Sequence, residues 1–159
     1  MRQEDSQLNS TLLNGCGCLV ILMILTAIAL PSFLNMANKS KQSEAKQYVS
    51  SMNKGQQAYF AENTKFADDV TGLGIGLKTA TTNYTYNIGV AAGGATSGAT
   101  PATASPLKSY AGAVGLVSAG EAKTTQSILC EGATGGAPTA IVPDGTTAPT
   151  CTGMTEVTK

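Results

Sequence analysis

The sequence predicts an α+β fold, in which a long, kinked N-terminal α-helix packs on a small antiparallel β-sheet. An apolar run at residues 10–31 continues into a segment, 32–62, whose apolar residues have helical spacing. Short runs of alternating apolar and polar residues follow in 63–159, as is typical of half-buried strands. The chain of 159 residues therefore divides into a leader-like tail (1–9), two helix halves and one β-rich globular domain.

The first helix half is apolar enough to enter a bilayer. From Leu19 to Leu30 every residue except Thr26 is aliphatic, Ala or Met. A transmembrane helix needs about 20 apolar residues to cross a hydrocarbon core of roughly 30 Å, and residues 12–30 just reach that length. The segment lacks the basic start and the clear cleavage site of a secretory signal peptide, so we expect it to remain in the mature protein.

The second helix half has one apolar face. After Pro31, apolar residues recur at helical spacing, and Lys and Gln occupy the other face. Pro31 should kink the helix, because its ring clashes with the preceding turn and one backbone hydrogen bond is lost. We expect this half to pack on the sheet.

Strands are expected at Tyr84–Val90, Leu107–Val117 and Thr125–Glu131, with a weaker candidate at Thr139–Val142. The intervening stretch 91–106 is of low complexity and, apart from its prolines, has no apolar side chain larger than Ala. Burial of such residues offsets little of their ordering entropy. We therefore expect a mobile surface loop here.

The four cysteines fall into two pairs. Cys16 and Cys18 lie in the apolar run, where small apolar side chains are the simplest interpretation. Cys130 and Cys151 would close a loop of about 20 residues, and a disulfide there would be worth about 3 kcal/mol. Such a bond suits a small domain exported to an oxidising compartment.

Residues suited to catalysis are scarce. The chain has no His, which removes the commonest general base and metal ligand. Asp68 and Asp69 are adjacent and should point apart, and the carboxylates after Cys130 are too widely spaced for a calcium site. We expect no enzyme activity, no cofactor and no metal. Ten basic and ten acidic residues give no indication of DNA as a partner, without excluding it.

Residues 27–60, AIALPSFLNMANKSKQSEAKQYVSSMNKGQQAYF, closely resemble type IV pilins, and in particular the cyanobacterial pilin-like G/H proteins. Shorter blocks follow in the expected order, namely LGIGL at 73–77, NYTYNI at 83–88, LKSYAGAV at 107–114 and SILCE at 127–131. The resemblance implies the type IV pilin fold, with a disulfide-closed loop near the C-terminus. It also implies a structural subunit of a type IV pilus, used for adhesion, motility or DNA uptake.

In this family a prepilin waits in the inner membrane, is cut by a dedicated peptidase, and is added to an extracellular pilus by assembly machinery. The partners implied are therefore identical or related pilin subunits. Contacts with the membrane or with those subunits would come from large apolar side chains, while a plain lipid anchor is the alternative role for the same segment. The side chains are Leu19, Val20, Ile21, Leu22, Ile24, Leu25 and Ile28.

The processing motif departs from the family's pattern. The cleavage glycine is replaced by Asn9, and the usual phenylalanine after it is replaced by Ser10. Asn14 stands in place of a glutamate whose carboxylate is thought to neutralise the new N-terminal amine. Without cleavage that carboxylate would be buried and unpaired, which is costly. We expect no cleavage at the standard position; a processed subunit at a filament tip and an altered sequence are the alternatives.

Two other functions are consistent with the same residues. One is a pseudopilin of a secretion system, and the other is a bitopic membrane protein that regulates pilus assembly without polymerising. Lys39, Lys41 and Lys46 follow the apolar run, and the positive-inside rule would place them in the cytoplasm. We give more weight to the resemblance, which places the C-terminal domain outside the cytoplasm.

Overall fold

The structure, a computed structural model, describes residues 4–103, 105–120, 122–141 and 145–157, and within the helix it omits the side chains of 4–16, 18 and 27–31. The chain forms two compact units, residues 1–39 and 40–159. In the described residues one helix precedes seven strands: α1 (Glu4–Asn63), β1 (Tyr84–Ala91), β2 (Gly94–Pro101), β3 (Lys108–Ala119), β4 (Ala122–Thr134), β5 (Ala140–Ile141), β6 (Thr150–Cys151) and β7 (Thr155–Glu156).

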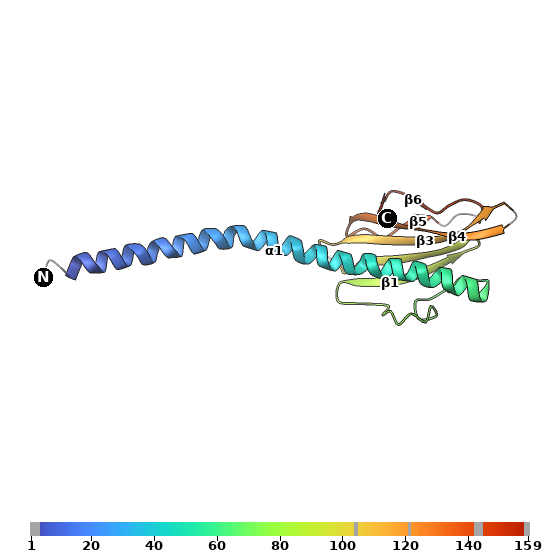
Figure 1. The fold of residues 1–159 in the computed structure, drawn as a ribbon, viewed down its shortest axis with the longest axis horizontal. Helices are drawn as coiled ribbons and strands as arrows, with labels where there is room; N and C mark the ends of the chain where they lie inside the picture. The colour runs from blue at the N-terminus through green and yellow to red at the C-terminus, as the bar shows by residue number, and fades with distance from the viewer. Residues whose placement is uncertain (1–3, 104, 121, 142–144, 158–159) are drawn as a thin grey trace. The chain divides into compact units, whose positions relative to one another are not determined.

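The main sheet has five antiparallel strands in the order β1-β2-β3-β4-β7, and β5 pairs with β6 in a separate ribbon. In the second unit, α1 lies along one face of the main sheet (Figure 1). The fold is therefore α+β, a helix packed on an antiparallel sheet, as the sequence predicts. The helix begins at Glu4, inside the stretch expected to be a leader-like tail, and continues through Pro31 to Asn63.

One stripe of α1 makes the core of the second unit. Ala45, Val49 and Met52 are fully buried, and their spacing of three to four residues places them on one side of the helix. They pack against Tyr84 and Tyr110 of the sheet in a single cluster. This stripe is the apolar face expected for residues 32–62.

Two buried amides of the helix bind the backbone that faces them. The Gln56 side chain both donates to Ala67 O (2.8 Å) and accepts from Ala67 N (2.9 Å), so it ties the loop after α1 to the helix. Asn53 Nδ2 donates to Ile128 O of β4 at 2.9 Å. Asn53 reaches the sheet because Gly112 of β3 leaves room for it. A Cβ at Gly112 would lie 2.3 Å from Asn53 Oδ1.

The expectation of a mobile loop over 91–106 is wrong. β2 occupies half of that stretch and pairs with β1 and β3. Ala95, Ser97 and Ala99 of β2 are at most 1% exposed. Small side chains are buried here because they let the helix approach the sheet closely, and backbone hydrogen bonds to both neighbouring strands replace the missing apolar area.

The remaining strands lie close to their expected positions. β1 and β4 cover two of the main candidates, β3 covers the third except for its first residue, Leu107, and β5 falls within the weaker one at Thr139–Val142. The short strands β6 and β7 were not expected. Cys130 of β4 is bonded to Cys151 of β6, with their Cα atoms 5.7 Å apart. This disulfide holds the C-terminal segment to the sheet.

Candidate assembly interface

Large apolar side chains of the first unit are exposed on consecutive positions of α1. Leu19, Val20, Ile21, Leu22, Ile24 and Leu25 are each 50–59% exposed, and Met23 is 68% exposed. Seven consecutive residues complete almost two turns at 3.6 residues per turn, so they surround the helix. This part of α1 is apolar on every side, in contrast to the single stripe at Ala45–Met52.

A helix that is apolar all round is normally buried by its surroundings. An exposed patch of this kind marks a surface that binds protein or lipid. Among the residues that the structure describes, no helix combines the length and the hydropathy needed to cross a bilayer. We call the exposed apolar stretch at residues 19–25 the apolar segment.

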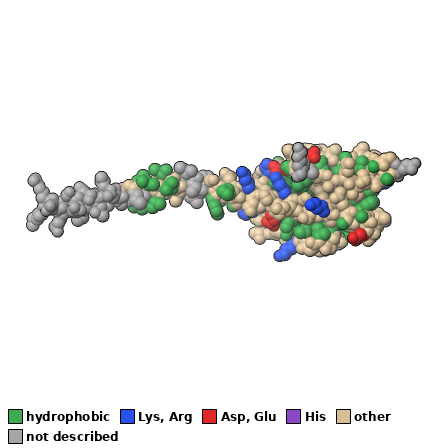
Figure 2. Space-filling view, in the orientation of Figure 1, with side chains coloured by type: hydrophobic (Ala, Val, Ile, Leu, Met, Phe, Trp, Pro, Cys, Tyr) green, Lys and Arg blue, Asp and Glu red, His purple; other side chains and the backbone are tan. Residues whose placement is uncertain are grey.

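A second exposed apolar group follows along the same helix. Phe33, Leu34 and Met36 are 71%, 62% and 68% exposed. Lys39 and Lys41 come next and are also exposed. Figure 2 shows the helix with two groups of hydrophobic side chains and basic side chains beyond the second. Sequence analysis did not single out this second group, although its proximity to Pro31 and the apolar run was a usable signal.

An ion-pair network fastens the amphipathic helix to the sheet in the second unit. Glu131 of β4 lies 3.0 Å from Lys46 Nζ of α1, and it also contacts Lys108 Nζ of β3. The Tyr110 hydroxyl lies 3.1 Å from both Glu131 Oε2 and Gln42 Oε1. Partial burial would raise the pKa of Glu131, but hydrogen bonds from Lys108 and Lys46 outweigh it and hold that pKa below its ordinary value.

Replacing Glu131 by Gln should lower the free energy of unfolding at neutral pH by about 1–2 kcal/mol, because charge-assisted hydrogen bonds are lost while the lysines stay partly in solvent. Since the folded-state pKa of Glu131 is lowered, its contribution is present above the unfolded-state pKa and disappears as the pH falls through the folded-state value. Urea unfolding of wild type and variant should therefore differ at pH 7 and converge in strong acid. Glu62→Gln, which changes an exposed residue, is the control. Equal free energies of unfolding for wild type and Glu131→Gln at pH 7 would contradict the stabilising role of the ion-pair network.

Two of the buried tyrosines, Tyr84 and Tyr110, donate hydrogen bonds through their hydroxyls. Burial, with the nearby carboxylates Glu44 and Glu131, raises the pKa of Tyr84 to about 12. Its hydroxyl donates to Lys108 O at 2.9 Å. Burial also raises the pKa of Tyr86 and of Tyr110. These phenols stay protonated at physiological pH.

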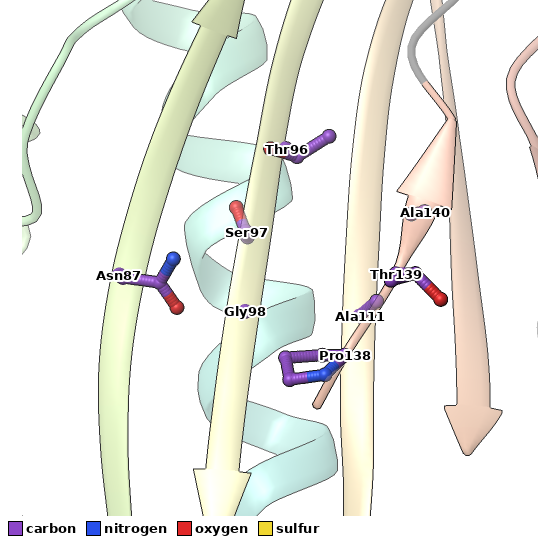
Figure 3. A pocket seen from close by; sticks show the side chains of 8 residues that line it. All are labelled: Asn87, Thr96, Ser97, Gly98, Ala111, Pro138, Thr139 and Ala140. Atoms are coloured by element: carbon purple, nitrogen blue, oxygen red, sulfur yellow. The ribbon is translucent and has the colours of Figure 1, made fainter. Parts of the chain in front are cut away.

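A cavity of about 330 Å³ opens on the sheet face opposite to α1. Figure 3 shows Asn87 and Pro138 reaching over Gly98 from opposite sides of β2. The cavity is lined by Asn, Ser, Thr, Gly, Ala and Pro, with no charged side chain. It therefore offers no acid, base or cation for chemistry.

Asp68 and Asp69, the adjacent acidic pair of the sequence, lie in an exposed turn. Asp69 accepts hydrogen bonds from Thr71 Oγ1 and from Gly72 N, each at 2.5 Å, and these bonds lower its pKa. It closes a local turn and is exposed together with Asp68. In the described residues no group of three His, Cys, Asp or Glu could hold a metal ion.

Some residues that the sequence indicated for processing, for the helix kink or for contacts cannot be compared with the structure. The side chains of Asn9, Ser10, Asn14, Ile28 and Pro31 fall outside the described residues. The expected processing region and the expected kink at Pro31 therefore stay predictions. The Glu131 network was missed, because nothing in the linear spacing of Lys46, Lys108 and Glu131 indicates that they meet.

A long helix whose second part packs on an antiparallel sheet, with a disulfide-bonded C-terminal segment, defines a pilin-type fold. Residues 42–153 match the family described as "Type IV pilin-like G and H, putative", and the chain belongs to this family. The matched region contains the packed part of α1, the main sheet except β7, and both bonded cysteines.

The chain is also similar to the type IV major pilin protein PilA of Myxococcus xanthus (strain DK1622). The two are 32% identical over 83 residues, which cover 52% of this chain and 37% of the relative. The aligned part thus spans little more than a third of that protein. No solved structure matches the chain.

Proposed function

We propose that this protein is a structural subunit of a type IV pilus, which assembles when the apolar segments of many subunits pack together. The observation that carries the proposal is the exposure of residues 19–25 on all sides of α1, in a chain that belongs to a type IV pilin-like family. Packing of these helices would remove apolar area from water at about 25 cal/mol per Å². Ile28, on the same helix, would join this contact surface.

Before assembly, the same segment would hold the subunit in the inner membrane, and the globular unit would lie outside the cytoplasm. The Cys130–Cys151 bond supports this placement, because disulfides persist in oxidising compartments. Pro31 would bend the helix between its two halves. Partners would be identical or related pilin subunits and the assembly machinery. The pilus would serve adhesion, motility or DNA uptake, and no described residue favours one of these roles.

Asn9, Ser10 and Asn14 support a further part of the proposal, that the subunit is not cut at the standard position. An intact N-terminus leaves no new amine for a carboxylate at position 14 to neutralise, and the neutral amide of Asn14 avoids a buried unpaired charge. The function proposed is structural, with no catalytic group assigned.

Native material sheared from cells should contain long filaments that include this chain, and its N-terminal peptide should begin before Ser10. Electron microscopy with immunogold labelling tests the first statement, and intact-mass spectrometry of the same filaments tests the second. A chain that starts at Ser10 would contradict the processing hypothesis while leaving the pilus function intact.

The same experiment separates the alternatives. A chain that occurs solely in the membrane fraction, at full length, would favour a non-polymerising regulator. Short filaments confined to the cell envelope would favour a pseudopilin of a secretion system. Either result would overturn the proposal of a pilus subunit.

A further inference from the structure

Another cavity, of about 440 Å³, lies at the end of the main sheet where β1 and β3 end and β4 begins. The last turn of α1 and the loop after it form the other walls, so the whole cavity belongs to the second unit, residues 40–159. Its volume is in the range of small-molecule sites, about 300–1,000 Å³. The larger side chains that line it are Phe60, Lys65, Phe66, Val90, Leu116 and Lys123.

The apolar side of this cavity contains two aromatic rings. Phe60 and Phe66 stack with their ring centres 4.7 Å apart. Leu116 and Val90 line the same cavity, and Val90 is 50% exposed. Aromatic rings bind other rings through stacked or edge-to-face contacts and make no demand for a hydrogen bond. This wall therefore suits a flat apolar group.

A strained turn sets the position of Phe66. Thr64 has a φ of 55°, and among the residues that the structure describes it is the one residue other than Gly with a positive φ. Its N–H donates to Phe60 O at 2.8 Å at the end of α1, and Gln56 then holds Ala67 close to the helix. A positive φ is unfavourable for a β-branched residue, and such strain occurs preferentially at functional sites. The turn brings the ring of Phe66 onto that of Phe60.

The polar side of the cavity carries positive charge. Lys65 follows α1 and Lys123 belongs to β4, and both side chains line the cavity at exposed positions. Of the described residues that line it, none is acidic. Two ammonium groups beside stacked rings match a ligand with an apolar ring at one end and an anionic group at the other. A neutral ligand would use the rings but not the charge.

We propose that this cavity binds a small aromatic carboxylate. The ring of the ligand would lie against Phe60, Phe66 and Leu116. Its carboxylate would lie between Lys65 and Lys123, where charge-assisted hydrogen bonds from both ammonium groups can reach it. The cavity volume suits a free molecule of one or two rings. This binding goes beyond the proposed role in pilus assembly and does not depend on it.

The test is a titration of the full-length, isotope-labelled protein in neutral detergent, followed by NMR. Two probes of the same shape are compared: naphthylacetate, which carries a carboxylate, and naphthylacetamide, which is neutral. Free probe concentrations are measured by equilibrium dialysis, because both probes also enter micelles. The backbone amide signals of Val90, Leu116 and Lys123 should shift and saturate with naphthylacetate, with a dissociation constant of about 1 mM for a ligand of this size. Naphthylacetamide should bind about fivefold more weakly, and high salt should reduce that difference.

The double variant Lys65→Gln/Lys123→Gln should bind naphthylacetate no more tightly than naphthylacetamide. The control pair Lys54→Gln/Lys78→Gln removes the same charge at exposed positions that do not line the cavity, and it should bind like wild type. Val90→Asp places a carboxylate in the wall and should abolish binding of naphthylacetate while the rest of the spectrum stays unchanged. Equal affinities of wild type for the two probes would overturn the inference. So would an unchanged affinity of the first pair, an equal loss in both pairs, or signal shifts confined to residues outside the cavity.

Discussion

Replacing Gly112 by Ala is expected to destabilise the globular unit by about 3 kcal/mol, although the change adds a single methyl group. The new Cβ would lie 2.3 Å from Asn53 Oδ1 and 2.7 Å from Val49 Cγ1. Both partners belong to the buried stripe of α1, so the helix would have to move away from the sheet. The hydrogen bond from Asn53 to Ile128 O would be lost with that movement. Urea unfolding of the full chain in detergent, followed by circular dichroism, measures the effect.

Gly89→Ala is the matched control, because Gly89 also lies within a paired strand. A Cβ there would approach only the Thr96 hydroxyl, at 2.9 Å, and that side chain can rotate. The control should cost less than about 1 kcal/mol. Similar unfolding midpoints for Gly112→Ala and wild type would show that the helix does not depend on this close approach.

The close packing of the helix on the sheet also explains why β2 could not be predicted. β1 was found because Tyr84 and Tyr86 alternate with polar residues, which is the pattern of a half-buried strand. β2 lacks this pattern and consists mainly of Gly, Ala, Ser and Thr. Of these residues, Gly and Ser are typical of turns. Their burial follows from the nearby helix and from pairing with β1 and β3. Both are long-range features, so no local pattern in residues 91–106 reports them.

The contact surface was easier to predict than the network that supports the globular unit. Residues 19–25 are apolar in sequence and exposed in the structure, so composition alone indicated a surface that needs a partner. Glu131 meets Lys108 because β3 pairs with β4, and it meets Lys46 because α1 packs on the sheet. The position of a charge on one strand says nothing about which helix residue will lie above it. Interfaces built from continuous segments can thus be read from sequence, whereas networks built across elements cannot.

Replacing Leu22 by Lys is expected to abolish filament formation while leaving the globular unit folded. Leu22 is 52% exposed and makes no contribution to the core of the second unit, so unfolding of that unit should be unchanged. In the filament the lysine would be surrounded by apolar helices. A charge at the centre of an apolar helix costs about 3 kcal/mol, which corresponds to a weakening of more than a hundredfold for each subunit added. Electron microscopy of sheared material should therefore show no filaments.

Thr124→Lys adds the same charge at an exposed position of β4 and should leave filaments intact. Because the same apolar segment would serve in the membrane first, the amount of Leu22→Lys protein in the membrane fraction has to be measured as well. Normal membrane levels without filaments would place the loss at the packing of helices against each other. Filaments of normal length from Leu22→Lys would mean that the apolar segment does not lie between subunits, and a different surface would then have to carry assembly.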